Sequence, residues 1–170
     1  HFGTGTDDGD KITWNGTTTI PTGASDTVEY DYTLAGAGTF PAGTTAVHNT
    51  ATIDSDQTDP LSDPEMIWVG AAPGLTIDKE CTPATGNSPE DVVHCVVSYE
   101  NTGDADATNA SIVDDYDETY GTVSNITDSD HFGTGTDDGD KITWNGTATI
   151  PAGASDTVEY DYTLAGAGTF

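Results

Sequence analysis

The sequence predicts an all-β protein built from antiparallel β-sandwich modules in tandem. Residues 1–40 return at 131–170 apart from two Thr-to-Ala changes, which sets a period of 130 residues. Such a repeat length matches the size of one domain. Apolar and polar residues alternate along several short segments, as they do in strands with one buried face. Gly, Pro, Asp and Asn separate these segments, and no amphipathic helical pattern competes with them.

The first four expected strands lie in one stretch of the period. Segment 75–81, LTIDKEC, places its odd-numbered residues on one face. Segment 91–103, DVVHCVVSYENTG, alternates in the same way before an Asn-Thr-Gly turn. Segment 107–116, ATNASIVDDY, predicts a third strand, and the weaker pattern of 121–128 predicts a fourth.

Three more strands complete the set. Segments 140–147 and 156–164 predict a fifth and a sixth, separated by the turn IPAGAS. Segment 45–55, TAVHNTATIDS, predicts the seventh and is present only after the first copy of the repeat. Seven short strands at this spacing indicate immunoglobulin-like antiparallel β-sandwich modules.

We expect the domain boundary in residues 55–74, which are rich in Pro and Asp. Residues 1–70 would then form the C-terminal part of one sandwich repeat plus a linker. Residues 71–170 would form the larger, N-terminal part of the next repeat, with its last strand outside the sequence. Such a sandwich exposes an edge and an apolar groove, which a strand from the following chain or from a neighbouring subunit can fill. We therefore expect a slice of a longer array.

The charge of the chain excludes several partners. The sequence has 30 Asp and Glu against 3 Lys and no Arg, which gives a net charge of −27. Nucleic acids and anionic membrane surfaces would be repelled, so neither is expected as a partner. No apolar run is long enough for membrane insertion in this segment. The acidity favours calcium or a salt-rich medium, and a merely solvated acidic surface is the alternative.

The cysteines and the glycosylation sequons point outside the cell. Cys81 and Cys95 fall on inward faces of neighbouring strands, so we expect a disulfide, with two buried free thiols as the alternative. A metal site would need more Cys or His nearby. Four Asn residues begin N-x-[ST] sequons, namely Asn15, Asn109, Asn125 and Asn145. Together these features indicate an extracellular or cell-surface glycoprotein.

Lys79 is unusual because it lies on an expected inward face, where a charge must be paired or neutralised. Asn49 lies on the inward face of 45–55, between Val47 and Ala51. A neutral lysine can attack such a carboxamide to form an amide crosslink when a carboxylic acid assists proton transfer. Asp115 is the expected acid, and the Asn49 partner would come from an adjacent repeat. The alternative is a Lys79 whose amine reaches solvent beside a surface Asp.

Acidic turns are candidate calcium sites, since calcium binds six to eight oxygens from flexible carboxylate-rich loops. The strongest candidate follows the strand 45–55, and the turn TDDGDK occurs in both copies of the repeat. The residues are Asp54, Asp56, Asp59 and Asp63 at the junction, and Asp7, Asp8, Asp10, Asp137, Asp138 and Asp140 in the turns. Solvated acidic turns are the alternative for each group. We expect no organic cofactor.

The stretch VVSYENTGDADATNASIVDDYDE (96–118) resembles the conserved-repeat family called domain of unknown function 11. The segments LTIDKECTP, ITWNGTATIPAGASDTVEYDYTL and VHNTATIDSD also occupy typical positions of that family. This resemblance covers essentially the whole period. It implies a secreted, tandemly repeated module of bacterial or archaeal surface proteins that catalyses no turnover.

These features together predict a structural repeat of an extracellular filament, fibre or surface-layer array. Identical repeats or subunits would join end to end through junctions or strand complementation. The alternatives are a stalk module of a cell-surface adhesin and an accessory domain of a secreted enzyme. We expect no enzyme activity, because no nucleophile elbow and no metal-binding His pair occur in the sequence.

Overall fold

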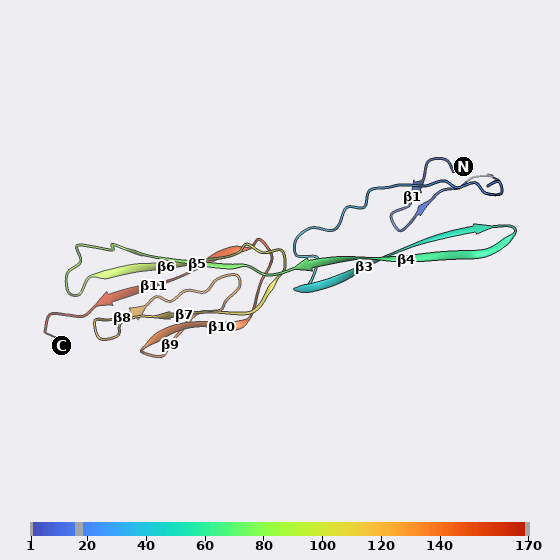
Figure 1. Cartoon of the computed structure of the whole chain (residues 1–170). Coiled ribbons are helices and arrows are strands. Elements are labelled where there is room, and N and C mark those ends of the chain that lie inside the picture. Colours follow the sequence, from blue (N-terminus) through green and yellow to red (C-terminus); the bar gives the residue numbers. More distant parts are fainter. Residues whose placement is uncertain (1, 16–18, 169–170) are drawn as a thin grey trace. The chain divides into compact units, whose positions relative to one another are not determined.

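A computed structural model describes residues 2–15 and 19–168, without the side chains of residues 146 and 147 (Figure 1). The elements assigned within this part of the chain are all β-strands, so the prediction of an all-β protein is confirmed. The chain divides into two compact units, His1–Leu34 and Ala35–Phe170. The first unit contains β1 (Thr6–Asp7) and β2 (Ile12–Thr13), which pair antiparallel.

The second unit contains a long hairpin and two antiparallel sheets. Its strands are β3 (Gly43–Ser55), β4 (Thr58–Ala71), β5 (Leu75–Thr82), β6 (Val92–Asn101), β7 (Ala107–Asp115), β8 (Gly121–Ser124), β9 (Thr136–Asp137), β10 (Lys141–Ile150) and β11 (Ser155–Leu164). Strands β3 and β4 pair with each other. The other strands form a sheet in the order β5-β6-β11-β8 and a sheet in the order β7-β10-β9.

The two sheets share one hydrophobic core, an arrangement consistent with a β-sandwich, and we call the strands β5 to β11 the sandwich. The largest fully buried side chains include Trp144 and Ile142 from one sheet and Tyr160 and Val158 from the other. The ring centroids of Trp144 and Tyr160 lie 6.4 Å apart. Burying each large apolar side chain stabilises the fold by about 1.5–3 kcal/mol, so this core supplies most of the sandwich's cohesion.

The alternation read from the sequence explains how strands β6 and β11 form. Val93, Cys95, Val97 and Tyr99 are buried on one face of β6, and the residues between them are less buried. Strand β11 pairs antiparallel with β6 along its length, with Tyr160 opposite Cys95. Both strands therefore point an apolar row into the core and a polar row away from it.

The turn after β6 is fixed by a fully buried side chain, Asn101. Its Oδ1 accepts hydrogen bonds from the backbone N–H groups of Gly74 and Gly103, and its Nδ2 donates to the carbonyl oxygens of Ala105 and Ile150. A Cβ at position 103 would collide with the backbone of residues 72–74, so glycine is needed there. The Asn-Thr-Gly turn thus joins β6 to both sheets through satisfied buried polar groups.

Strand β4 was not expected from the sequence. Residues 55–74 read as a linker because they are rich in Pro and Asp, yet Thr58–Ala71 pairs with β3 from Ala71 opposite Gly43 to Thr58 opposite Ser55. Strand β4 pairs only with β3 in the described sheets, so it is an edge strand. An edge strand tolerates proline because one side of its backbone has no partner to bond.

The two copies of the repeated sequence have different structures. Residues 141–150 and 155–164 of the second copy form β10 and β11, whereas the described residues from 19 to 40 of the first copy form no strand. Val158 is fully buried and its counterpart Val28 is 46% exposed. In the second copy β10 pairs with β7, and β11 pairs with β6 and β8, so partner strands rather than local sequence decide the difference.

Candidate functional site

One side of the sandwich is open, and this side is the candidate site. Strand β5 is the end strand of one sheet and β7 is the end strand of the other. A salt bridge from Lys79 on β5 to Asp114 on β7 shows that these two end strands face each other. The backbone N–H and C=O groups on the outer side of β7 have no strand partner among the described residues, which makes β7 a template for another strand.

The inward face of β5 is uncovered along this open side. Leu75 is 55% exposed and Ile77 is 64% exposed. Their cross-strand partners on β6 are Asn101 and Tyr99, which are buried. Partners directly opposite each other share one face of a sheet, so Leu75 and Ile77 point to the core side although nothing described covers them. We call Leu75, Ile77 and the edge of β7 the open groove.

Lys79 and Asp114 form a partly buried ion pair within this groove. The Lys79 Nζ donates a hydrogen bond to Asp114 Oδ1 at 2.7 Å, and the Asp114 side chain is 5% exposed. The same Nζ lies 5.5 Å from the centroid of the buried Tyr160 ring. Burial lowers the pKa of Lys79, but the hydrogen bonds and charges of Asp114 and Tyr160 outweigh it, and the net pKa is raised. Lys79 is therefore charged in the open groove.

The carboxylate of Asp114 is only partly satisfied by hydrogen bonds. Its Oδ2 is buried and has no hydrogen-bond partner among the described residues. A buried acceptor without a donor costs about 1–3 kcal/mol, and more when it is charged. Such an atom is rarely left unpaired in a native assembly, so a donor from outside the described contacts would stabilise it.

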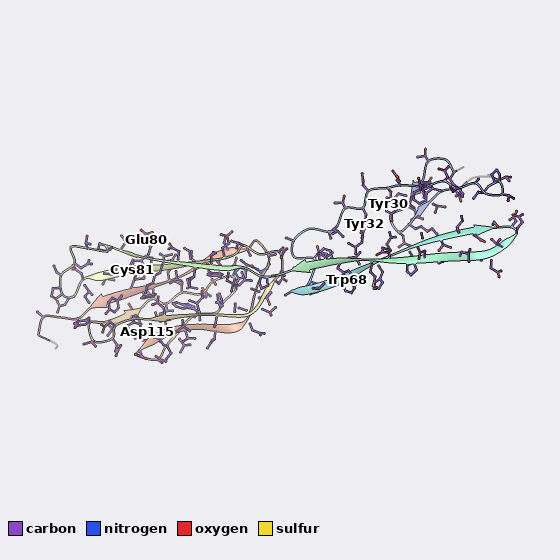
Figure 2. All side chains as sticks on the ribbon, in the orientation of Figure 1. Tyr30, Tyr32, Trp68, Glu80, Cys81 and Asp115 are labelled. Atoms are coloured by element: carbon purple, nitrogen blue, oxygen red, sulfur yellow. A yellow bond between two sulfur atoms is a disulfide. The ribbon has the colours of Figure 1, made fainter. Side chains whose placement is uncertain are left out.

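The expectation that Asp115 faces Lys79 is wrong. Asp115 is exposed on β7, where it lies opposite Lys141 in the register, and its neighbour Val113 is 55% exposed (Figure 2). Ile112, Asp114 and Tyr116 are the buried residues at this end of the strand. The larger side chains of Ile112 and Tyr116 occupy the core side, so Asp114 follows them inward. If the alternation in this segment is aligned with Ile112 and Tyr116 as the buried residues, it assigns Asp114 to the inward face.

The disulfide between Cys81 and Cys95 is confirmed. The two residues lie opposite each other on β5 and β6, with Cα atoms 4.1 Å apart (Figure 2). Since Cys81 shares the inward face of Lys79 two residues away, the bond holds β5 in place next to the ion pair. It also closes a loop with a sequence separation of 14 residues.

Asn49 lies on β3, outside the Lys79–Asp114 pair. It is exposed and lies opposite Glu65 in the register of the hairpin. Along β3 it shares a face with Val47, Ala51 and Ile53, as the sequence predicts for alternating residues. On β4 the same face carries Leu61, Ile67 and Val69, which lie opposite residues 53, 47 and 45, and also the acids Asp63 and Glu65, which lie opposite Ala51 and Asn49. We call this row of six apolar residues and Asn49 the apolar face of the hairpin.

The acidic turns TDDGDK bond to their own backbone. In the second copy, Asp137 Oδ1 accepts from Gly139 N, while Asp138 Oδ1 accepts from the backbone N–H groups of Asp140 and Lys141. These backbone hydrogen bonds, that of Lys141 foremost, lower the pKa of Asp138. The first copy repeats these bonds with Asp7, Asp8 and Asp10.

The acids of the hairpin, Asp54, Asp56, Asp59 and Asp63, are exposed. Within residues 2–15 and 19–168 no group of three or more His, Cys, Asp or Glu side chains is arranged to hold a metal ion. Calcium binding therefore stays a prediction for both acidic regions.

The sequon residues are exposed. Asn109 and Asn125 have positive φ angles of 56° and 53°, which Asn tolerates better than most residues. The Asn125 Nδ2 donates to Asp161 Oδ2 at 2.7 Å, and Asn145 is exposed on β10. Asn15 is exposed too, but the rest of its sequon lies outside the described residues. Glycosylation of these residues stays a prediction.

Comparisons with known proteins do not assign a role to the open groove. No family model, no curated protein and no solved structure matches this chain. Among the described residues, no helix has the length and apolar character needed to cross a membrane.

Proposed function

We propose that this chain is a structural repeat of an extracellular filament, fibre or surface-layer array. Its immunoglobulin-like sandwich repeats assemble end to end by strand complementation, and a neighbouring copy of the hairpin β3–β4 fills the open groove. The observation that carries this proposal is the exposure of Leu75 and Ile77 on a core-facing row beside the unpaired edge of β7.

The hairpin has the surface that such a groove needs. Its apolar face is uncovered at the tip, where Ile53 is 50% exposed and Leu61 is 67% exposed. These two residues lie opposite each other, so they form one apolar patch. Covering each Leu or Ile side chain contributes about 1.5–3 kcal/mol. Burying Leu75, Ile77 and the hairpin patch together would therefore supply a substantial driving force for assembly.

Further features of the chain support an extracellular structural role. The disulfide is typical of oxidising compartments outside the cytosol. The repeat after 130 residues provides identical joining surfaces, and joints between unlike surface patches extend into open arrays. The resemblance to domain of unknown function 11 implies a secreted tandem module. We infer no turnover of a substrate.

Self-association of the purified chain tests the proposal. Each chain carries a net charge of −27, so association should strengthen at about 1 M salt, where the screening length is about 3 Å. We expect sedimentation velocity to detect dimers and longer species, and negative-stain images to show linear rows.

Matched substitutions locate the joining surface. Ile77→Asp places a charge in the groove and should abolish association, whereas Thr76→Asp adds the same charge on the opposite face of β5 and should not. Leu61→Asp and Ser62→Asp make the same comparison on the hairpin. Monomers of the wild-type chain at all salt concentrations, or equal association of Ile77→Asp and Thr76→Asp, would overturn the proposal.

A further inference from the structure

We propose that residues 1–34 bind a further copy of the polypeptide that holds strands β5 to β8 and complete it to a sandwich. These four strands lie within residues 71–130, which we call the template. The partner of residues 1–34 is thus a template whose place for β10 and β11 is open. This joint uses neither the hairpin nor the open groove, so the inference goes beyond the proposed function and is tested separately from it.

The structure contains the template together with the segment that fills it. Strand β11 lies between β6 and β8, and β10 pairs with β7. Both filling strands belong to the second copy of the repeated sequence, and the first copy differs from it at only two positions. The first copy therefore carries the sequence of a segment that is already known to fit these three strands.

The side chains that the template buries in the second copy are exposed in the first copy. Val158 is fully buried and its counterpart Val28 is 46% exposed. Ile150 is 2% exposed, whereas its counterpart Ile20 is 44% exposed. Removing apolar side chains from water is favourable, so docking on a template would stabilise the first copy as it stabilises the second.

Part of the docked conformation is already present in the first copy. Strands β1 and β2 pair with Asp7 opposite Ile12, in the register that β9 and β10 show with Asp137 opposite Ile142. This local pairing forms in both copies, so it does not require a template. The described residues from 19 to 34 form no strand, and their counterparts in β10 and β11 pair with β6, β7 and β8 of the template. The preformed part lowers the conformational cost of docking.

The two differing positions rank the two copies as occupants. Ala148 is 6% exposed and Ala152 is half-buried. The first copy has Thr22 in place of Ala152 and Thr18, which lies outside the described residues, in place of Ala148. Adding a methyl and a hydroxyl group at a packed position is destabilising, so the first copy is the weaker occupant. Residues 131–170 accordingly keep the template of their own sandwich.

A chain extended at its N-terminus by an added template tests the inference. Asp130 is followed by His131, so joining residues 71–130 to His1 reproduces a junction that the sequence already contains. The added template is then open, and residues 1–34 follow it directly. The rest of the chain is unchanged.

An engineered disulfide reports docking in the expected register. Thr157 on β11 lies opposite Ser98 on β6, and Thr27 is the counterpart of Thr157. Ser98→Cys in the added template and Thr27→Cys should therefore form a disulfide, which peptide mapping identifies. Asp31→Cys, four residues further along the same expected face, should not form it.

Matched substitutions test the apolar contact. Val28→Asp places a charge where the second copy buries Val158 and should abolish the disulfide. Thr33→Asp adds the same charge on the expected outward face and should leave it intact. Thr18→Ala should strengthen docking about tenfold, measured by titrating the disulfide with glutathione.

Absence of the disulfide, or equal yields for Thr27→Cys and Asp31→Cys, would overturn the inference. Equal yields for Val28→Asp and Thr33→Asp would overturn it too. Ile77→Asp outside the added template blocks the hairpin joint, so the disulfide should persist there, and its loss would overturn the separation of the two joints. Formation of the disulfide in a chain that never self-associates would support this inference and overturn the proposed function alone.

Discussion

Trp14 and Trp144 hold the same position in the two copies of the repeat but have different surroundings. Trp144 is fully buried, its Nε1 donates to the carbonyl oxygen of Thr127 at 2.9 Å, and its ring packs near Tyr160. Trp14 is half-buried, and its ring lies 6.0 Å from that of Tyr30. Trp14→Ala and Trp144→Ala therefore make the same substitution in the same local sequence but in two different environments.

The structure sets the expected sizes of the two effects. Removing a buried Trp side chain costs about 3–5 kcal/mol. Loss of the indole hydrogen bond adds about 1 kcal/mol, so we expect Trp144→Ala to lower the free energy of unfolding of the sandwich by at least about 4 kcal/mol. Trp14→Ala leaves the sandwich core intact, and its effect on the same transition should stay within about 0.5 kcal/mol.

Urea unfolding followed by circular dichroism measures both variants with the disulfide intact. Thermal unfolding provides a second measure, because 1 kcal/mol shifts the midpoint by about 4–8 °C in a domain of this size. Trp144→Phe retains a large apolar ring, and it keeps the comparison measurable if the Ala variant is unfolded at the outset. A similar loss in Trp14→Ala and Trp144→Ala, or a loss below about 1 kcal/mol in Trp144→Ala, would refute the assignment of the core to the second copy.

Three further predictions concern the sandwich. Replacing Cys81 and Cys95 by Ser should cost about 3 kcal/mol in urea unfolding, the chain-entropy value for a loop of this size, and unchanged stability would contradict it. Asn101→Ala removes the partners of four backbone groups and should cost at least about 3 kcal/mol, so a near-neutral result would exclude the role given to this turn. The hydrogen bond and charge of Asp161 raise the pKa of His94 above 6.5, and its stabilising effect is complete below pH 6.5 and is lost as the pH rises through the raised value. An NMR titration in which Asp161→Asn leaves the pKa of His94 unchanged would rule out this cause.

Much of the strand pattern could be predicted because burial on one face leaves a period of two in the sequence. The expected strands 75–81 and 156–164 agree with β5 and β11 to within one residue at each end. Strand β4 could not be found in this way. Most of its apolar residues follow one another in the run Met66–Val69 instead of alternating with polar ones. It also contains Pro60 and Pro64, which favour a linker in composition but are tolerated on an edge strand.

The ion pair shows where a period of two becomes ambiguous. In the segment IVDDY, either Val113 or the pair Ile112 and Tyr116 can mark the buried face. The structure buries Ile112 and Tyr116, and this choice brings Asp114 to Lys79. The inward position of Lys79 followed from alternation alone, but its partner depended on which of two apolar sets packs better. That competition is decided by the opposite sheet, which the local sequence does not contain.

The two copies of the repeat support the proposal that this chain functions as part of an assembly. Tyr160 is buried between strands that pair on both sides of β11, whereas its counterpart Tyr30 is 44% exposed. The same residues therefore form a strand only when partner strands are present. The hairpin β3–β4 satisfies its own backbone pairing but leaves apolar side chains uncovered, and the open groove leaves both an edge and apolar side chains uncovered. The apolar side chains of the hairpin and those of the open groove could therefore cover each other between two copies. A repeat that cannot bury its own apolar face gains stability by stacking on an identical neighbour.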